Sequence, residues 1–499
     1  MATQHPDNAS VPYWHHSALV TSAEEVRESM ISWREFGSEE VKWDWEGKLV
    51  EESVLERLFM TESEYLFKNS LGSSHFLTFR IPHPTKEKGG RYWRALTSIV
   101  TAQKLVAELS LNHSPLTEVI LPMTTSAQEL ITVHTDLHEL TQFYANRFNT
   151  SKTTINSSVF RIIPLVETIE ALSNYDAIIQ EYVNWYSNHY QEKMVSFRPY
   201  IARSDPALQS GLLAAVLVSK LALSKIHEQG RVHDIEMYPI IGMGSLPFRG
   251  GLSPVTVDSM LAEYQGVATF TIQSAFRYDY SKETARQSIK KINEAKFTPL
   301  PSITSSEAEF LKSAIEIAGS HYQQALAPLL PLFSQFSSLI PKRRERFSSQ
   351  NNLFSYDRES QGVSLPRAIT FTAILYSLGL PPELLGMGQA LQEIFSLPNA
   401  AELLEKFYPS LVLHAQSAGA YLNREGLQEL IQKYPELRTI ITDIQLTEKL
   451  LKIELGPVTQ DQQQHAGFSS QIITKVCAAE YLEVPALIEA AASIRKSIG

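Results

Sequence analysis

The sequence predicts an α/β fold with parallel β-strands, followed by a predominantly helical C-terminal part. Between residues 118 and 273, short runs of β-branched residues alternate with long helical segments, and beyond Ser305 almost every segment has a helical pattern. Strands that alternate with helices are joined by crossovers and therefore run parallel. The composition, 43% hydrophobic and 20% charged, is typical of a globular protein with a large core.

The first predicted strand leads into a helix, and the second leads to a candidate site residue. Glu118–Met123 is rich in β-branched residues, and Ser126 and Glu129 follow with the spacing of a capping box, which predicts a long helix. Val159–Val166 is a second β run, and it delivers Glu167 to the end of a strand.

Three further strands follow, and then the helical part. They are predicted at Val195–Ile201, Ile235–Ile241 and Val267–Gln273. A long helix at 207–229, which Gly230 is expected to end, separates the first two. Two prolines within 297–304 mark a weak seam, and the last helix is predicted at 484–496.

Charge and cysteine content exclude several classes of protein. The chain has 499 residues, a net charge of −10 and a pI near 5.8, which disfavours binding to nucleic acid. One cysteine, Cys477, excludes an internal disulfide framework and a cysteine zinc site. No uninterrupted apolar run reaches the ~18 residues of a membrane span, and residues 1–5 lack the pattern of a signal peptide. We therefore expect a cytoplasmic enzyme that binds neither nucleic acid nor membrane.

Residues that are distant in sequence are expected to meet at the ends of the predicted strands. In an α/β barrel, catalytic residues lie at the carboxyl ends of the strands, where Glu167, Asp205 and the loop 242–254 all fall. Two carboxylates at neighbouring strand ends could hold one Mg²⁺ or Mn²⁺. The alternative is that both are ordinary solvated acids.

The loop 242–254 could bind an anion. Its glycines would let the backbone approach a ligand closely, and Arg249 offers a bidentate fork for phosphate or carboxylate. The loop matches neither a Walker A loop nor a dinucleotide fingerprint, so a simple turn is an equal alternative.

Three other positions are ambiguous when read alone. The basic run 342–346 is typical of a solvated charged face. Arg367 stands beside an apolar segment, where a guanidinium needs an anionic partner. His5 lies so close to the chain start that fraying is the ordinary expectation.

Several segments together resemble the short, archaeal-type branch of the phosphoenolpyruvate carboxylase family, over the whole chain from Thr3 to Gly499. They are Thr3–Asn8 (TQHPDN), Trp43–Lys48 (WDWEGK), Leu165–Thr168 (LVET), Ser204–Pro206, Gly242–Gly251, Gln273–Tyr280 (QSAFRYDY) and Leu365–Ile369 (LPRAI). The length of 499 residues also fits this branch.

The resemblance implies an activity and an architecture. The family irreversibly forms oxaloacetate and phosphate from phosphoenolpyruvate and bicarbonate, through carboxyphosphate and a metal-bound enolate, in anaplerotic carbon fixation. It uses Mg²⁺ or Mn²⁺ and is typically a homotetramer. The implied fold is a TIM-like (β/α)8 barrel with extensive additional α-helices. We expect one domain over 1–499, with a barrel core at about 70–300 plus 365–380 and a helical part at about 305–499.

The resemblance also implies roles for individual residues. Catalytic roles fall on His5, as the base, and on Arg249 and Arg367, which would hold the transferred phosphate; metal binding falls on Glu167 and Asp205; substrate binding falls on Arg80, Arg343, Arg344, Gly250 and Gly251. One of Arg343 and Arg344 would stand for a further phosphate-binding arginine of the family, and the resemblance leaves open which of the two. The stretch Asp44–Gly47 resembles a segment near the active site of the larger enzymes.

This chain departs from the larger enzymes at several positions. Ile241 and Met243 replace a histidine and an arginine of the glycine loop, and Leu208 replaces a lysine. Arg203 is the candidate that would restore the lost charge. The C-terminus lacks the asparagine that helps to bind inhibitory aspartate, which argues against feedback inhibition by aspartate or malate.

Two rival functions remain open at this point. Another barrel lyase acting on phosphoenolpyruvate or pyruvate would turn over without bicarbonate. A non-catalytic scaffold on the same fold would bind neither metal nor phosphoenolpyruvate.

Overall fold

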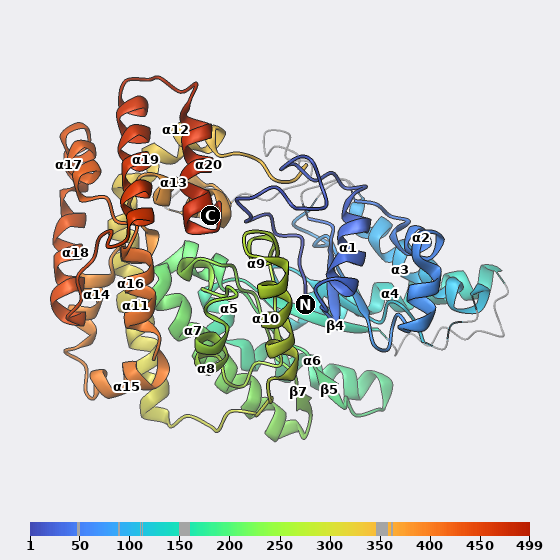
Figure 1. Cartoon of the computed structure of the whole chain (residues 1–499). Coiled ribbons are helices and arrows are strands. Elements are labelled where there is room, and N and C mark those ends of the chain that lie inside the picture. Colours follow the sequence, from blue (N-terminus) through green and yellow to red (C-terminus); the bar gives the residue numbers. More distant parts are fainter. Residues whose placement is uncertain are drawn as a thin grey trace.

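A computed structural model of the chain describes residues 1–46, 50–87, 90–109, 111, 113–148, 160–345, 358–360 and 363–499 (Figure 1). Gly47 and Lys48 of the WDWEGK motif, and Val159 at the start of a predicted strand, lie outside the described residues.

The centre of the fold is a seven-stranded sheet in which all neighbours run parallel and follow one another in chain order. Its strands are β1 (Glu40–Asp44), β2 (Phe76–Arg80), β3 (Glu118–Leu121), β4 (Arg161–Val166), β6 (Tyr200–Ile201), β8 (Ile240–Ile241) and β9 (Thr269–Phe270). The predicted α/β class and parallel strands are therefore confirmed. The described sheet has seven strands, whereas the resemblance implied eight.

The sheet is strongly curled. Ala2 forms parallel bridges both to Val41 of β1 and to Ile272, just beyond β9, so the chain start lies between the two edge strands. Successive strand residues alternate between two cores, as a pleated strand requires. One small cluster fills the concave side and contains Met1, Ile120, Ile163, Leu165, Tyr200, Ala202 and Ile240. Their neighbours along the strands pack outward against helices.

Two predicted strands are each divided in two. Val195–Ile201 becomes β5 (Ser196–Phe197) and β6, and Ile235–Ile241 becomes β7 (Glu236–Met237) and β8. Pro199 and Pro239 lie at the breaks, where proline has no N–H to donate to a neighbouring strand. β5 and β7 pair with each other in a separate two-stranded sheet, and β10 (Arg358–Ser360) and β11 (Val363–Leu365) form another.

Helices make up most of the remaining structure. In chain order they are α1 (Glu25–Arg34), α2 (Val54–Lys68), α3 (Arg91–Glu108), α4 (Ala127–Phe148), α5 (Ile169–Ser173), α6 (Tyr175–Tyr190), α7 (Ser204–His233), α8 (Val257–Glu263), α9 (Ser274–Tyr278), α10 (Lys282–Glu294), α11 (Ser305–Leu326), α12 (Leu330–Phe336), α13 (Ala368–Ser377), α14 (Met387–Ile394), α15 (Ala400–Phe407), α16 (Leu411–Gly419), α17 (Arg424–Lys433), α18 (Arg438–Leu451), α19 (Gln460–Cys477) and α20 (Val484–Arg495). The helices from α11 onward gather on one side of the sheet (Figure 1). The predicted helical character beyond Ser305 is confirmed.

Helix α7 differs from its prediction at both ends. It begins at Ser204, is kinked at Gly211, where φ is +81°, and continues to His233. Gly230 therefore lies inside the helix, and Asp234, in the left-handed region, ends it. A Cβ at Gly230 would lie 2.8 Å from the Met237 side chain, which explains the glycine by close packing instead of capping. The helix is long and apolar enough to cross a membrane, as is a bent pair over 368–394. However, 83% of its apolar window is buried within the fold, as in a core helix.

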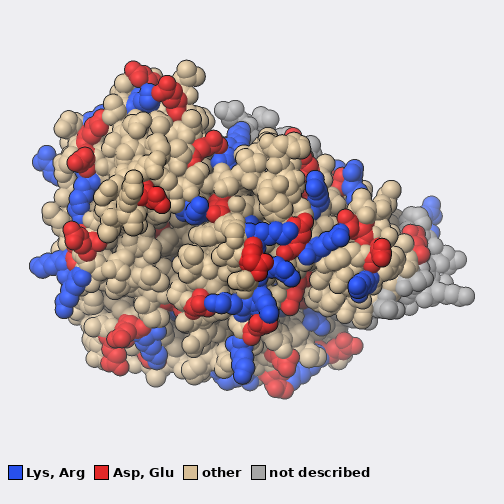
Figure 2. Space-filling view, in the orientation of Figure 1, with Lys and Arg blue, Asp and Glu red and all other residues tan. Residues whose placement is uncertain are grey.

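The boundaries of the sheet also differ from expectation. The first strand, β1, precedes the predicted core start at about residue 70, and the segment expected at 365–380 is mainly the helix α13. On the face shown in Figure 2, acidic and basic side chains are interspersed over the described residues, without a continuous basic strip.

Candidate functional site

A cavity of about 350 Å³ lies at the carboxyl ends of the central strands. Its walls come from segments that are far apart in sequence: the N-terminus, β1, β2, the ends of β4, β6 and β8, the segment 337–344, the start of α13 and residue 498. Eight predicted site residues line it: His5, Arg80, Glu167, Asp205, Arg249, Arg343, Arg344 and Arg367. The fold thus brings most of the predicted set to one place.

The N-terminal segment is held by a dense set of hydrogen bonds. Asp7 Oδ1 accepts the Ala275 N–H at the start of α9 (2.7 Å), and Asp279 accepts the N–H groups of Ala9 (2.7 Å) and Ser10 (2.6 Å). The His5 carbonyl accepts from Ser274 Oγ (2.8 Å). The expectation that His5 is frayed is therefore wrong, because hydrogen bonds hold this segment against the sheet and the start of α9.

His5 lies half-buried in the cavity wall. Its Nδ1 lies 3.1 Å from Thr3 Oγ1. Burial lowers the pKa of His5 well below its usual value, and the nearby positive charges of Lys42 and Arg80 lower it further. The imidazole is therefore neutral at neutral pH and can accept a proton.

Glu167 and Asp205 follow neighbouring strands. β4 pairs with β6, so Glu167, directly after Val166, and Asp205, in the first turn of α7, face the same cavity. Carboxylate oxygens are the ligands that Mg²⁺ and Mn²⁺ prefer, and one or two suffice when water and substrate complete the shell. Among the described residues, no group of three or more His, Cys, Asp or Glu could hold a metal. The two carboxylates that face the cavity fit a hard cation whose remaining ligands are water and substrate.

Arg249 is buried and fixed by three partners. Its Nη1 donates to Gly499 O (2.8 Å) and pairs with Asp7 (3.3 Å), and its Nη2 donates to Gln273 Oε1 (2.6 Å). Both chain ends thus converge on this guanidinium. Only Nε has no hydrogen-bond partner.

Gly250 and Gly251 lie outside the cavity lining and serve the shape of the loop. Gly250 has φ +128°, and a Cβ there would lie 2.9 Å from the Met243 Cβ; Gly251 has φ +79°. Both conformations favour glycine. A conformational role accounts for both residues, and no substrate contact is apparent from their position.

Arg80 and Arg367 converge on one acidic residue. Arg80 donates from Nε (2.8 Å) and Nη2 (2.6 Å) to Asp44, and it also pairs with Glu46. Arg367, whose side chain is 38% exposed, pairs with Glu46 at 3.0 Å. The anionic partner that the apolar setting of Arg367 required is therefore Glu46, and Asp44–Glu46 is part of the site wall, as the motif suggested.

Arg343 and Arg344 are largely engaged within the protein. Arg343 donates to the carbonyls of Asn8 (2.9 Å) and Ala9 (3.0 Å) and to Glu489 (3.0 Å). Arg344 pairs with Glu25 and Glu28. Of the two, only Arg344 keeps a nitrogen, Nε, without a hydrogen-bond partner.

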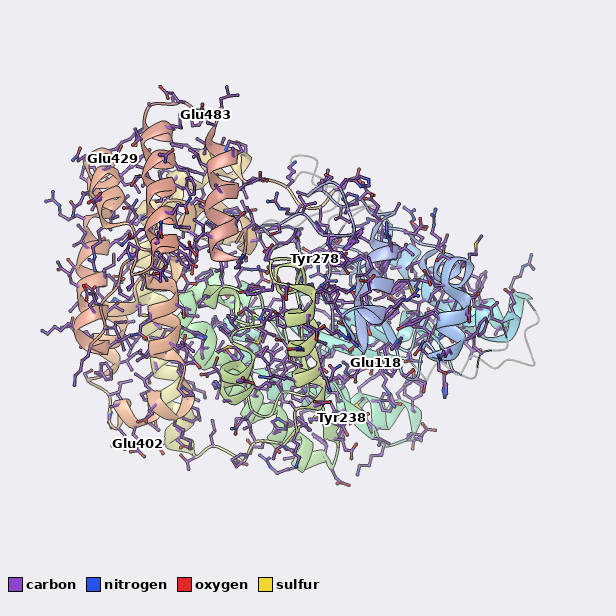
Figure 3. The ribbon with its side chains drawn as sticks, viewed as in Figure 1. Glu118, Tyr238, Tyr278, Glu402, Glu429 and Glu483 are labelled. Atoms are coloured by element: carbon purple, nitrogen blue, oxygen red, sulfur yellow. The ribbon has the colours of Figure 1, made fainter. Side chains whose placement is uncertain are left out.

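The partner of Arg344 belongs to a buried ionic cluster. Glu28 Oε1 accepts from Arg344 (2.7 Å), Arg277 (3.2 Å) and the hydroxyl of Tyr278 (2.8 Å), which lies at the end of α9 (Figure 3). Burial alone would raise the pKa of Glu28, but Arg344 and Arg277 overcome this effect and hold it at about 2. The cluster joins α1 to α9 and to the segment around residue 344.

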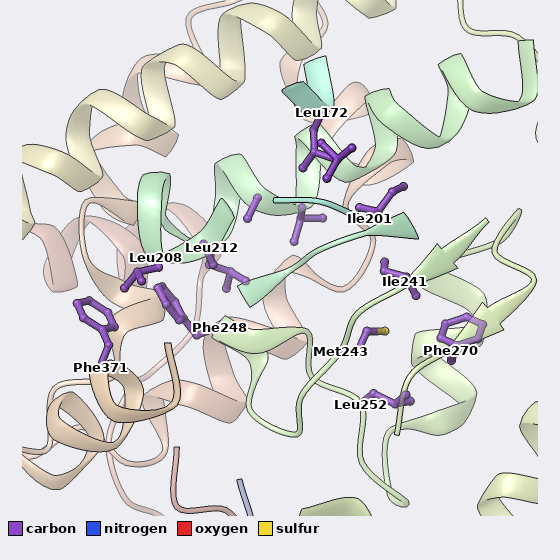
Figure 4. Packing of buried hydrophobic residues seen from close by; sticks show 14 of the residues in the cluster. Leu172, Ile201, Leu208, Leu212, Ile241, Met243, Phe248, Leu252, Phe270 and Phe371 are labelled. Carbon is purple, nitrogen blue, oxygen red and sulfur yellow. The ribbon is translucent and has the colours of Figure 1, made fainter. Parts of the chain in front are cut away.

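The departures from the larger enzymes are explained by packing. Leu208, Ile241 and Met243 are buried in the large hydrophobic core and pack among apolar neighbours (Figure 4). Arg203 lines the cavity and is fully buried, and its Nε donates to the Tyr264 hydroxyl at 2.9 Å.

Sequence reasoning overlooked Lys42 in the middle of β1. Its side chain is fully buried, lines the cavity, and places Nζ 3.9 Å from Asp44 Oδ2. Burial lowers the pKa of Lys42 to about 7, and Arg80 adds to the effect. The only available signal was a lysine in an otherwise strand-like run, Glu40–Asp44, directly before the recognised motif.

Comparison with known proteins identifies the family of the chain. The family described as phosphoenolpyruvate carboxylase matches residues 1–499. Phosphoenolpyruvate carboxylase of Leuconostoc mesenteroides is 33% identical over 100% of this chain and 98% of that protein. The enzymes of Metallosphaera sedula and Caldivirga maquilingensis are 36% and 32% identical, each over 100% of this chain and 99% of its own length. The chain therefore belongs to the short, archaeal-type branch of the phosphoenolpyruvate carboxylase family.

Proposed function

We propose that this chain forms oxaloacetate and phosphate from phosphoenolpyruvate and bicarbonate. One observation carries the proposal: His5, Glu167, Asp205, Arg249 and Arg367 come from five separate segments and line a single cavity of about 350 Å³. A cavity of this size admits a three-carbon phosphate and a one-carbon anion. The family relationship supports the same reaction.

The cations of the cavity explain how an acidic protein draws in phosphoenolpyruvate. Arg367 is the most accessible arginine of the wall and can exchange part of its contact with Glu46 for a phosphate oxygen. Arg249 and Arg344 are held rigidly and each keep Nε for a further acceptor. Fixed donors around the transferred phosphate stabilise its charge without reorganisation.

His5 supplies the base. Attack of bicarbonate on phosphorus gives carboxyphosphate and the enolate of pyruvate, and carboxyphosphate must lose a proton as it yields CO₂ and phosphate. The lowered pKa of His5 keeps its imidazole neutral and ready to take that proton.

Glu167 and Asp205 would hold the divalent metal, Mg²⁺ or Mn²⁺, which supplies a Lewis acid next to the developing enolate charge. Part of the wall is apolar: Leu165, Ala202, Ile340 and Ile498 line the cavity. Such a wall limits the access of water, which would protonate the enolate to pyruvate.

We also propose that the barrel is closed. Ala2 accepts the Lys42 N–H (2.9 Å), and Thr3 donates to Ile272 O (2.9 Å). Residues 1–3 would thus take the eighth position of a (β/α)8 ring and carry His5 directly to its carboxyl end. Gly250 and Gly251 would then shape the loop that holds Arg249.

The test is an assay coupled to malate dehydrogenase, with phosphoenolpyruvate, Mg²⁺ or Mn²⁺, and bicarbonate either added or rigorously removed. NADH oxidation that requires bicarbonate and metal supports the proposal. Turnover without bicarbonate would favour a related lyase. No turnover and no binding of phosphoenolpyruvate by folded protein would favour a scaffold.

The metal ligands have a separate test. Glu167→Gln and Asp205→Asn should weaken Mn²⁺ binding, measured directly by electron paramagnetic resonance, whereas the exposed Asp258→Asn serves as a matched control outside the cavity. Unchanged Mn²⁺ affinity in both site variants would remove them as ligands.

A homotetramer and a cytoplasmic location remain predictions from the family. Light scattering coupled to size exclusion should give four times the chain mass of 56.1 kDa.

A further inference from the structure

The cavity wall contains a buried cation, Lys42, whose ammonium makes no hydrogen bond to the described residues. Eight basic side chains line the wall: Lys42, Arg80, Arg203, Arg249, Lys342, Arg343, Arg344 and Arg367. Lys342 is exposed, and each arginine makes at least one hydrogen bond or ion pair. Among the residues that the structure describes, Lys42 is the buried cation of this wall whose charged group makes no hydrogen bond.

The position of Lys42 is central. It belongs to β1 and lines the same cavity as His5, and its charge contributes to the lowered pKa of the His5 imidazole. Glu167, Asp44 and Glu46 in turn attract its ammonium. The nearest carboxylate oxygen, Asp44 Oδ2, is 3.9 Å away and already accepts from Arg80 at 2.6 Å.

Arg203 is a second candidate for the same task, because its Nη1 and Nη2 atoms are buried and have no hydrogen-bond partner. Its Nε donates to Tyr264, and its charge acts on Lys220 and His414, which do not line the cavity. The guanidinium is thus fixed at Nε to the tyrosine that follows α8, whereas the ammonium of Lys42 has no such fixed contact.

A buried ammonium without a hydrogen-bond partner costs stability unless a ligand supplies one. Resting on the function proposed above, we infer that Lys42 is a further substrate-binding residue, whose ammonium donates to a carboxylate-type oxygen of the bound anions beside His5 and Glu167. That oxygen belongs either to the carboxylate of phosphoenolpyruvate or to bicarbonate, which share the same O–C–O⁻ chemistry. Lys42 on β1 would then supply the positive charge that the larger enzymes have at the position of Leu208, since Leu208 is apolar and buried in the core.

The test compares Lys42→Met, which keeps the length and removes the charge, with Lys42→Arg, which keeps the charge. Lys220→Met is the matched control, because Lys220 is also a buried lysine but pairs with Glu263 at 2.7 Å outside the cavity. Measurements are the melting temperature, the affinity for phosphoenolpyruvate in the presence of Mn²⁺ without bicarbonate, and kcat and KM for each substrate.

Lys42→Met should leave the melting temperature unchanged or raise it, and should weaken one substrate by about 10–100-fold, as loss of a charge-assisted hydrogen bond does. Weaker binding of phosphoenolpyruvate without bicarbonate assigns the carboxylate, and a raised KM for bicarbonate alone assigns bicarbonate. Lys42→Arg should recover part of the loss. Lys220→Met should lower the melting temperature while KM stays unchanged.

Two results would overturn the inference: substrate affinities within about twofold of the wild type, or a lower melting temperature with proportionate loss of all activity. The wild-type protein is measured in parallel. Absence of oxaloacetate there would refute the proposed function itself, whereas a normal wild type with unaffected Lys42→Met refutes only the role of Lys42.

Discussion

At the scale of single residues, the surroundings of His5 determine its protonation state. Burial, together with the positive charges of Lys42 and Arg80, lowers the pKa of His5 and keeps its imidazole neutral. We predict that His5→Ala abolishes oxaloacetate formation, with a loss of about 10²–10⁴-fold in kcat, because a general base is removed. Mn²⁺ binding and the affinity for phosphoenolpyruvate should persist, and substrate-dependent phosphate release could be measured separately with a colorimetric assay. Normal carboxylation by this variant would eliminate His5 as the base.

Glu28 illustrates a residue whose charge stabilises the fold. Its pKa in the folded state is about 2, below the ordinary value of 4.5, so its contribution is complete above pH 4.5 and is lost as the pH falls toward 2. Glu28→Gln should therefore cost about 3 kcal/mol at pH 7. Urea titrations at a series of pH values should show the difference from wild type shrinking below pH 4.5. A difference that does not change with pH would assign the loss to packing instead of charge.

At the scale of elements, the glycine loop 242–251 holds Arg249 through its conformation. The substitution Gly250→Ala places a Cβ 3.0 Å from the Met243 backbone at φ +128°. We predict a loss of about 1–3 kcal/mol in stability together with a lower kcat/KM, because the loop must move. Gly456→Ala is the control: it has φ +138° but no atom within 4 Å of the added Cβ. Equal effects of both variants on kcat/KM would show that the loop does not control Arg249.

The order of elements could be predicted from sequence because it depends on local pattern. The runs at 118–123 and 267–273 and the helices beyond Ser305 carried their own periodicity. β1 and β2 were not identified as strands, since β1 holds Lys42 and Asp44 among its apolar residues and depends on partners elsewhere. Gly230 was misread because close packing against Met237 leaves the same signature as a cap.

The candidate site could also be predicted from the sequence only in part. The motifs could name His5, Glu167, Asp205, Arg249 and Arg367, and the fold brings them to one cavity. The sequence could not predict which hydrogen-bond donors of these arginines remain available for a ligand, because their partners are far away in sequence. Arg343 contacts residues 8, 9 and 489, and Arg344 contacts α1. The importance of Lys42 appears only when the contacts of the buried arginines of the wall are known, because each of them makes at least one hydrogen bond.

At the scale of the whole molecule, the cavity joins the two halves of the chain. Ile498 and the start of α13 line it together with the strand ends, and Arg249 in the first half donates to Gly499. Helix α11 also packs along α7, so the seam at 297–304 separates parts that share a core.

Because the halves share both core and cavity, we predict one cooperative thermal transition. At about 100 times Kd, phosphoenolpyruvate with Mn²⁺ adds about 2.7 kcal/mol, and a chain of 499 residues should then melt about 2–3 °C higher as a single peak in calorimetry. Glu167→Gln, with its weaker metal binding, should lose most of this shift without acquiring a second peak. Two separate peaks, of which only one responds to ligand, would divide the chain at the seam and contradict a single domain over 1–499. A single responsive peak requires that binding at the strand ends is felt by the helices from α11 to α20, which follows if Arg249 and Gly499 hold the chain ends at the same site.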